Sequence, residues 1–161
     1  MPHCSGLNPD RTADEAESRV RVLRETCQVN HLQDSVWIGR KVRTHALNAG
    51  MTVQQAWATA TAASELVTNA IKFAGCATIS IYALCAPAPG IEVIVDDDGP
   101  GIADPDAAMV DGFSHGRVLE PGERSPHGKG LGLGAVRRLT DELHLERRHP
   151  SGLRARFAKW R

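Results

Sequence analysis

Aromatic side chains are scarce in this sequence, at 4% of 161 residues, while hydrophobic residues as a class make up 42%. Ala, Val, Leu and Ile must therefore fill the core, and a chain of this length has room for one domain. Lys and Arg number 19, as do Asp and Glu, so the formal net charge is zero. Because a neutral chain has no overall field that attracts polyanions, nucleic acid is not expected as a partner.

Long apolar runs and closely paired cysteines are missing as well. No run is long enough to span a membrane, and the N-terminal MPHCSGLNPD lacks the pattern of a signal peptide. None of the four cysteines has the C-x-x-C spacing of zinc or thioredoxin-like sites. We therefore expect a soluble, cytoplasmic protein that does not bind membranes and keeps its cysteines as thiols.

Apolar periodicity predicts alternating strands and helices after a flexible tail at residues 1–17. Asp34 is the expected N-cap of the first helix, and Thr52 with Gln55 has the spacing of a capping box. The expected strands are 18–25, 77–84, 91–96, 144–149 and 153–160, and the expected helices are 34–50, 52–75, a short one at 104–105 onward and 131–143. This order predicts a two-layer α/β sandwich, with a mixed, mostly antiparallel sheet and helices on one face.

The segment ASELVTNA places two polar side chains on one face of the long helix. Glu65 and Asn69 are four residues apart, so they lie one above the other beside the apolar stripe. Their oxygens suit a hard cation such as Mg²⁺, and the carboxylate could also orient or deprotonate a hydroxyl. Considered alone, the segment is better explained as two solvated residues on an amphipathic helix.

The segment DDDGPGI follows an expected strand directly. Gly99 and Gly101 allow a sharp turn and a close approach of the backbone to a ligand. A carboxylate at the end of the strand can accept a hydrogen bond from a ligand amino group. An acidic turn is the simpler alternative, whereas a calcium-binding loop is excluded by the early glycine and the missing later Glu.

The segment GKGLGLG opens an expected helix. Glycines there expose backbone N–H groups to an anion, and Lys129 adds a positive charge. The spacing does not match a Walker A loop, which requires four residues between Gly and Gly-Lys and then Ser or Thr. A dinucleotide fingerprint is excluded because a loop, not a strand, precedes the glycines. A flexible glycine hinge remains as the alternative for this segment alone.

Taken together and in this order, the three segments resemble the ATP-binding domain shared by gyrase, Hsp90, bacterial histidine kinases and MutL. The resemblance covers roughly residues 35–160. It implies a GHKL-type domain of the Bergerat ATP-binding fold over residues 18–161, with a lid over ATP at about 103–127.

Within this family, the chain is most similar to the single-domain serine/threonine kinases of partner-switching systems, and in particular to the stressosome kinase. The similar segments are ASELVTNAIKFAG (63–75), DDGPGIADPDAAMVDGF (97–113), GLGLGAVRRLTDEL (130–143) and FAKW (157–160). The resemblance implies ATP and Mg²⁺ as cofactors and phosphorylation of a STAS-domain anti-anti-sigma or stressosome protein. A sigma factor and a PP2C-type phosphatase are the further partners that it implies.

The resemblance also assigns roles to individual residues. Glu65 would be the catalytic base, Asn69 would bind Mg²⁺, and Asp97 would accept a hydrogen bond from the adenine amino group. The residues expected to line the base are Gly99, Gly101 and Ile102, and those expected at the phosphates are Lys129, Gly130, Leu131, Gly132 and Leu133.

Two features depart from the family pattern. Gly152-Leu153 stands where Gly-Thr is usual, which removes a hydroxyl from the pocket below adenine, and the segment 103–127 is long for a stressosome kinase. Two alternatives to the kinase also remain open. One is a nucleotide-dependent switch without catalysis that binds STAS or phosphatase partners, and the other is a histidine-kinase catalytic domain that acts in trans.

Overall fold

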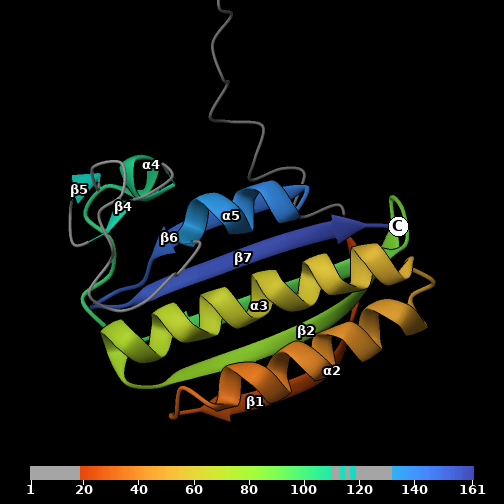
Figure 1. Ribbon diagram of the computed structural model, residues 1–161, viewed down its shortest axis with the longest axis horizontal. Helices are drawn as coiled ribbons and strands as arrows, with labels where there is room; N and C mark the ends of the chain where they lie inside the picture. Colours follow the sequence, from red (N-terminus) through yellow and green to blue (C-terminus); the bar gives the residue numbers. More distant parts are fainter. Residues whose placement is uncertain (1–18, 110–112, 115–116, 119–131) are drawn as a thin grey trace, which may run out of the picture.

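A five-stranded sheet with helices on one face forms the body of the molecule (Figure 1). The computed structural model describes residues 19–109, 113–114, 117–118 and 132–161. In chain order the elements are β1 (Val20–Val29), α2 (Asp34–Asn48), α3 (Val53–Ala74), β2 (Ala77–Ala86), β3 (Gly90–Asp97), α4 (Pro105–Ala108), β4 (Phe113–Ser114), β5 (Arg117–Val118), α5 (Gly132–Leu139), β6 (Glu142–Arg147) and β7 (Leu153–Trp160). The tail expected at 1–17 and much of the lid expected at 103–127 lie outside the described residues.

The sheet has the strand order β1-β2-β3-β7-β6, and each described pairing is antiparallel. Strands β2 and β3 form the expected hairpin, in which Ala77 pairs with Asp97. The expected two-layer α/β architecture is therefore confirmed, and the described part of the sheet is antiparallel throughout.

Helix α3 begins and ends where its capping residues predict. The Thr52 hydroxyl accepts a hydrogen bond from the Gln55 backbone N–H at 3.2 Å, and the Gln55 side chain accepts one from the Thr52 N–H at 2.9 Å. This reciprocal pair satisfies two N–H groups that the helix cannot satisfy itself. At the other end Gly75 adopts φ 82°, a left-handed conformation that stops the helix at low cost.

Three expected boundaries were wrong. Asp34 is not the N-cap of α2, because its carboxylate accepts from the Asn30 and His31 N–H groups and Gln33 holds the cap position. Strand β1 continues to Val29, where its pairing with β2 ends. Helix α5 stops at Leu139 and not at 143, because Glu142–Arg147 pair with β7 as a strand.

The core lies between the sheet and the helices, and aliphatic side chains dominate it. Phe157 at the centre of β7 is fully buried against this layer. Helical periodicity places Val53 and Trp57 on the apolar stripe of α3 together with Ala56, Ala60 and Val67, but this prediction is wrong for the first two, which are 59% and 55% exposed. These two side chains lie on the outer surface of the helix layer.

The opposite face of the sheet, which none of the described helices covers, carries a buried carboxylate. Glu92 on β3 has no exposed surface and forms ion pairs with Arg19, Arg21 and Arg156. The guanidinium of Arg21 also lies over the Tyr82 ring, 4.5 Å from its centre. Arginine side chains therefore shield this face from water in place of a second helix layer.

Replacing Glu92 with Ala is expected to lower the free energy of unfolding by about 3 kcal/mol, because the arginines around it lose their shared counter-charge. Urea denaturation measures this loss. Glu146→Ala, which removes an exposed carboxylate from β6, is the matched control and should change stability by less than about 0.5 kcal/mol. Equal stability of the two variants would contradict the prediction.

Among the described residues, no helix combines the length and apolarity needed to cross a bilayer. The cysteines that the structure describes are free thiols, with Cys27 half-buried and both Cys76 and Cys85 exposed.

Candidate functional site

The described parts of the segments singled out in the sequence lie on elements that pack together. Helix α3 packs against α5 and against β3. Short elements α4, β4 and β5 lie at one end of the molecule (Figure 1). The strand-end acids and the helix that carries Glu65 and Asn69 therefore border a common region.

Glu65 is half-buried on α3 and contacts the start of α5. Its carboxylate accepts a hydrogen bond from the Gly132 backbone N–H. Burial raises the pKa of Glu65, although the positive charge of Lys72 and the Gly132 bond act in the opposite direction. Two residues that the sequence placed in separate motifs are thus in direct contact, and the carboxylate holds a proton more readily than a solvated one.

Gly132 begins α5 with φ +68°, and a Cβ added to it would meet no atom within 4 Å. A side chain would have room there, so the left-handed backbone is what requires glycine at this position. The conformation directs the Gly132 N–H toward Glu65 at the N-terminus of α5, where backbone donors are not used within the helix.

Asn69 is half-buried and lies one turn beyond Glu65 on α3. In the described parts of the chain, no cluster of three or more His, Cys, Asp or Glu side chains could hold a metal ion. Mg²⁺ in nucleotide sites is held by one or two protein ligands together with phosphate oxygens. A single amide oxygen from Asn69 is compatible with that arrangement, with the phosphates as the main ligands.

Asp97 ends β3 as a buried carboxylate that is 8% exposed. Its Oδ1 accepts the Gly99 N–H at 2.9 Å and the Leu153 N–H at 3.3 Å. Burial raises the pKa of Asp97, while these two bonds and the charge of Arg148 lower it. Since both of these hydrogen bonds use Oδ1, the second carboxylate oxygen can accept a hydrogen bond from a ligand.

Close packing explains two of the glycines around Asp97. A Cβ at Gly99 would lie 2.7 Å from the Ala74 Cβ at the end of α3, so this glycine brings the strand-end loop against the helix. A Cβ at Gly152 would lie 2.1 Å from the Asp97 carbonyl oxygen, and its φ is +110°. Gly152 therefore allows β7 to begin directly against the carboxylate residue.

Leu153 replaces the hydroxyl residue that the family pattern predicts. Its backbone N–H donates to Asp97, and its half-buried side chain packs against the core. The backbone thus supplies one polar contact with Asp97 that does not depend on the side chain. Ile102 is likewise half-buried against the core, and Leu133 is buried in it.

Arg148 is a part of the site that sequence reasoning missed. Its Nη1 donates to the Asp97 carbonyl oxygen at 2.9 Å and to the Asp98 carboxylate at 2.7 Å. The Ser151 hydroxyl donates to the Asp98 carbonyl at 3.4 Å. The sequence does contain a pair of adjacent arginines and a run of three aspartates. Residue order alone, however, does not reveal which arginine pairs with which aspartate.

Replacing Arg148 with Met is expected to weaken ATP binding about tenfold, because a charge-assisted hydrogen bond that holds the Asp97 backbone is lost. Isothermal titration calorimetry measures the affinity. Arg154→Met is the matched control, because Arg154 pairs with Asp96 on the other face of the sheet at 2.7 and 2.9 Å. Equal affinities in the two variants would show that Arg148 does not position the site.

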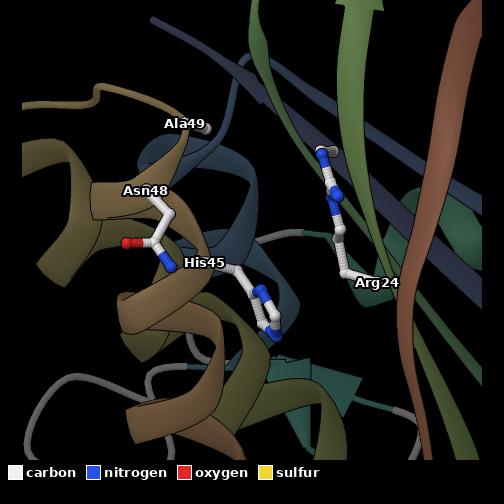
Figure 2. Close-up of a pocket in the computed structure, with 5 residues that line it drawn as sticks. Arg24, His45, Asn48 and Ala49 are labelled. Atoms are coloured by element: carbon white, nitrogen blue, oxygen red, sulfur yellow. The ribbon is translucent and has the colours of Figure 1, made fainter.

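A separate cavity of about 320 Å³ lies between β1, β2 and the C-terminal end of α2, lined by Arg24, His45, Asn48, Ala49 and Ala83. Arg24 projects from the strand side and His45 and Asn48 from the helix side (Figure 2). The C-terminal end of α2 repels anions, whereas Arg24 attracts them, so the cavity has no consistent preference for a phosphate.

Lys129, Gly130 and Leu131 lie outside the described residues, so their expected phosphate contacts stay predictions. The described geometry brings together Glu65 with Gly132 and Asp97 with Gly99. Asn69 shares the helix face of Glu65. A carboxylate beside a helix N-terminus, with a buried acceptor at a strand end, is suited to an anionic ligand that carries an amino-substituted ring.

Sequence similarity identifies the family of this chain. Residues 57–159 match the family model described as histidine kinase-, DNA gyrase B- and HSP90-like ATPase. The chain belongs to this ATPase family. This ATPase is also 37% identical over 145 residues to serine/threonine-protein kinase RsbT of Bacillus subtilis (strain 168), which covers 89% of this chain and 96% of the relative. Both the expected family and the expected likeness to serine/threonine kinases are confirmed, and ATP is the nucleotide that membership implies.

Proposed function

We propose that this ATPase is a protein serine/threonine kinase of a partner-switching system and that it phosphorylates a STAS-domain protein. The observation that carries the proposal is the contact between the half-buried Glu65 and the N-terminus of α5. A carboxylate at this point can reach a hydroxyl that approaches phosphates bound at the same helix end. The likeness to a serine/threonine kinase over most of the chain supports the same activity.

In the proposed reaction, Glu65 takes the proton of a serine or threonine hydroxyl on the partner. The hydroxyl oxygen forms a bond to the γ-phosphorus as the bond to the β-phosphate oxygen breaks, and ADP leaves with that electron pair. Asp97 holds the adenine amino group, with Gly99, Gly101 and Ile102 beside the ring. Lys129 to Leu133 hold the phosphates, and Asn69 contributes an oxygen to Mg²⁺, which neutralises phosphate charge when it is bound.

A transfer assay tests the proposal. The protein is incubated with labelled ATP, Mg²⁺ and a STAS-domain protein encoded beside it, and the labelled product is treated with acid. Acid-stable phosphoserine or phosphothreonine supports the kinase. Acid-labile phosphate would identify a histidine-kinase domain acting in trans instead, and nucleotide-dependent binding without transfer would identify a switch.

The proposal extends to the other partners and to location. A kinase of this class also binds a sigma factor or a PP2C-type phosphatase when its STAS partner is phosphorylated, and it meets these partners in the cytoplasm. The proposed domain spans 18–161, with the lid at about 103–127. Titrating the protein against each candidate partner, with and without transfer, tests this part separately from catalysis.

A further inference from the structure

The outer surface of the helix layer carries exposed apolar side chains beside unpaired positive charges. We refer to this surface as the α2–α3 ridge, which comprises Val36, Arg40, Arg43 and Leu47 of α2 with Val53 and Trp57 of α3. Val36, Val53 and Trp57 are more than half exposed, and Leu47 is 37% exposed. Figure 1 shows the two helices side by side in front of the sheet, with no other described helix or strand in front of them.

Contacts between the helices hold the ridge together. The guanidinium of Arg43 lies over the Trp57 ring, 4.4 Å from its centre. Gly39 allows the close approach, because a Cβ there would lie 3.3 Å from the Ala60 carbonyl oxygen. Leu47 lies four residues from Arg43 on α2, and Val53 lies four residues from Trp57 on α3, so each is a neighbour of this pair on its own helix. Leu47 and Val53 therefore extend the apolar surface beyond Trp57.

The charge of the ridge has one sign. Between Asp34 and Glu65 the sequence contains Arg40, Lys41 and Arg43 but no Asp or Glu. Lys41 is neutralised by Glu25 on the strand below. Within the described residues Arg40 and Arg43 form no ion pair, and the Nε of Arg43 is buried without a hydrogen-bond partner.

We propose that the α2–α3 ridge is a docking surface for an acidic segment of a partner protein that also presents apolar side chains. The carboxylates would pair with Arg40 and Arg43, and the apolar groups would cover Trp57, Leu47 and Val53. An exposed Trp stacked with an Arg is the kind of anchor that dominates protein interfaces. The inference goes beyond the proposed kinase reaction and does not depend on it.

Other occupants fit the ridge less well. Attraction to an anionic membrane typically involves clusters of about four to eight basic residues, which is two to four times the two arginines of the ridge. A second copy related by a twofold axis would set Arg40 and Arg43 against their own equivalents, and like charges at an interface are unfavourable. An acidic protein segment satisfies both the charge and the apolar surface.

Selection from random peptides displayed on phage tests the proposal with the full chain immobilised. The expected result is enrichment of peptides rich in Asp and Glu with interspersed apolar residues. Synthetic copies of these peptides should bind at least tenfold more weakly to Arg43→Glu and to Trp57→Ala. Arg40→Glu should also bind the peptides more weakly. Because Arg40 is exposed, this variant tests the ridge even if the other two variants fold poorly.

Two controls on β1 match these variants. Arg24→Glu reverses an exposed charge away from the ridge, and Leu23→Ala removes an exposed apolar side chain. Equal binding of the peptides to ridge and control variants would overturn the proposal, as would selected peptides without an acidic excess. Trp57-dependent binding to phosphatidylserine vesicles or Trp57-dependent dimerisation in sedimentation would overturn it in favour of those occupants.

Discussion

Glu65→Gln is expected to reduce phosphoryl transfer by about 10²- to 10⁴-fold, which is the usual contribution of a positioned general base. The amide retains the size of the side chain and an oxygen that can accept the Gly132 N–H. ATP affinity should therefore change by less than about threefold, because the hydrogen bond to Gly132 is retained. Single-turnover transfer to the STAS partner and calorimetric titration with ATP measure the two quantities. Undiminished transfer would refute the role of Glu65 as base.

The pH dependence gives an independent check on Glu65. Because burial raises its pKa, the carboxylate form needed for a base is reached at higher pH than for a solvated Glu. Transfer should rise with pH through this elevated pKa in the natural protein. The Gln variant should lack that rise. If the transfer rate rose with pH in the same way in both proteins, the titrating group would be one other than Glu65.

Glu65→Gln should leave the stability of the fold unchanged or raise it, although the same substitution reduces transfer. A carboxyl whose folded-state pKa lies above its unfolded value stabilises the fold below the unfolded pKa, and this contribution is lost as pH rises through the folded pKa. Ionised Glu65 therefore opposes folding at neutral pH. Glu65→Gln should melt at the same temperature or higher at pH 7, and a lower melting temperature would show that the charge itself is structural.

Asp97→Asn is expected to lower ATP affinity by about 10- to 100-fold, because the amide places a donor where the adenine amino group needs an acceptor. Discrimination against GTP should fall as well, since the amide can donate to the guanine carbonyl. The ratio of ATP to GTP dissociation constants measures this effect. Asp96→Asn, the neighbouring carboxylate paired with Arg154, is the matched control.

Retained ATP preference in the Asp97 variant would contradict its proposed contact with adenine. Loss of all nucleotide binding together with a lower melting temperature would indicate a folding defect instead.

Local signals in the sequence predicted most of the fold. The reciprocal Thr52 and Gln55 bonds depend on residues three apart, and the left-handed Gly75 depends on one residue, so both ends of α3 were predictable. The β2–β3 hairpin was likewise predictable from two apolar runs joined by a short turn. The boundary between α5 and β6 was not, because pairing of Leu143 with Phe157 is a long-range contact.

The candidate site was predictable to the extent that its residues lie in short motifs. Glu65, Asp97 and Gly132 could be selected because each lies where its chemistry is useful along its own segment. Arg148 could not, since its role comes from the β6–β7 connection, which the folded sheet brings to the end of β3. Trp57 was assigned to the apolar stripe because periodicity does not show that the helix layer ends there.

Helix α3 connects the α2–α3 ridge to Glu65 as one continuous helix. Trp57 and Glu65 lie eight residues apart on it, which at the rise of an α-helix is about 12 Å along the axis. The reciprocal cap at Thr52 and the stop at Gly75 keep this length constant. For a partner that binds at Trp57, the distance from this anchor to Glu65 would therefore be constant. Only an acceptor hydroxyl at the matching distance from the partner's acidic segment would reach the Glu65 carboxylate.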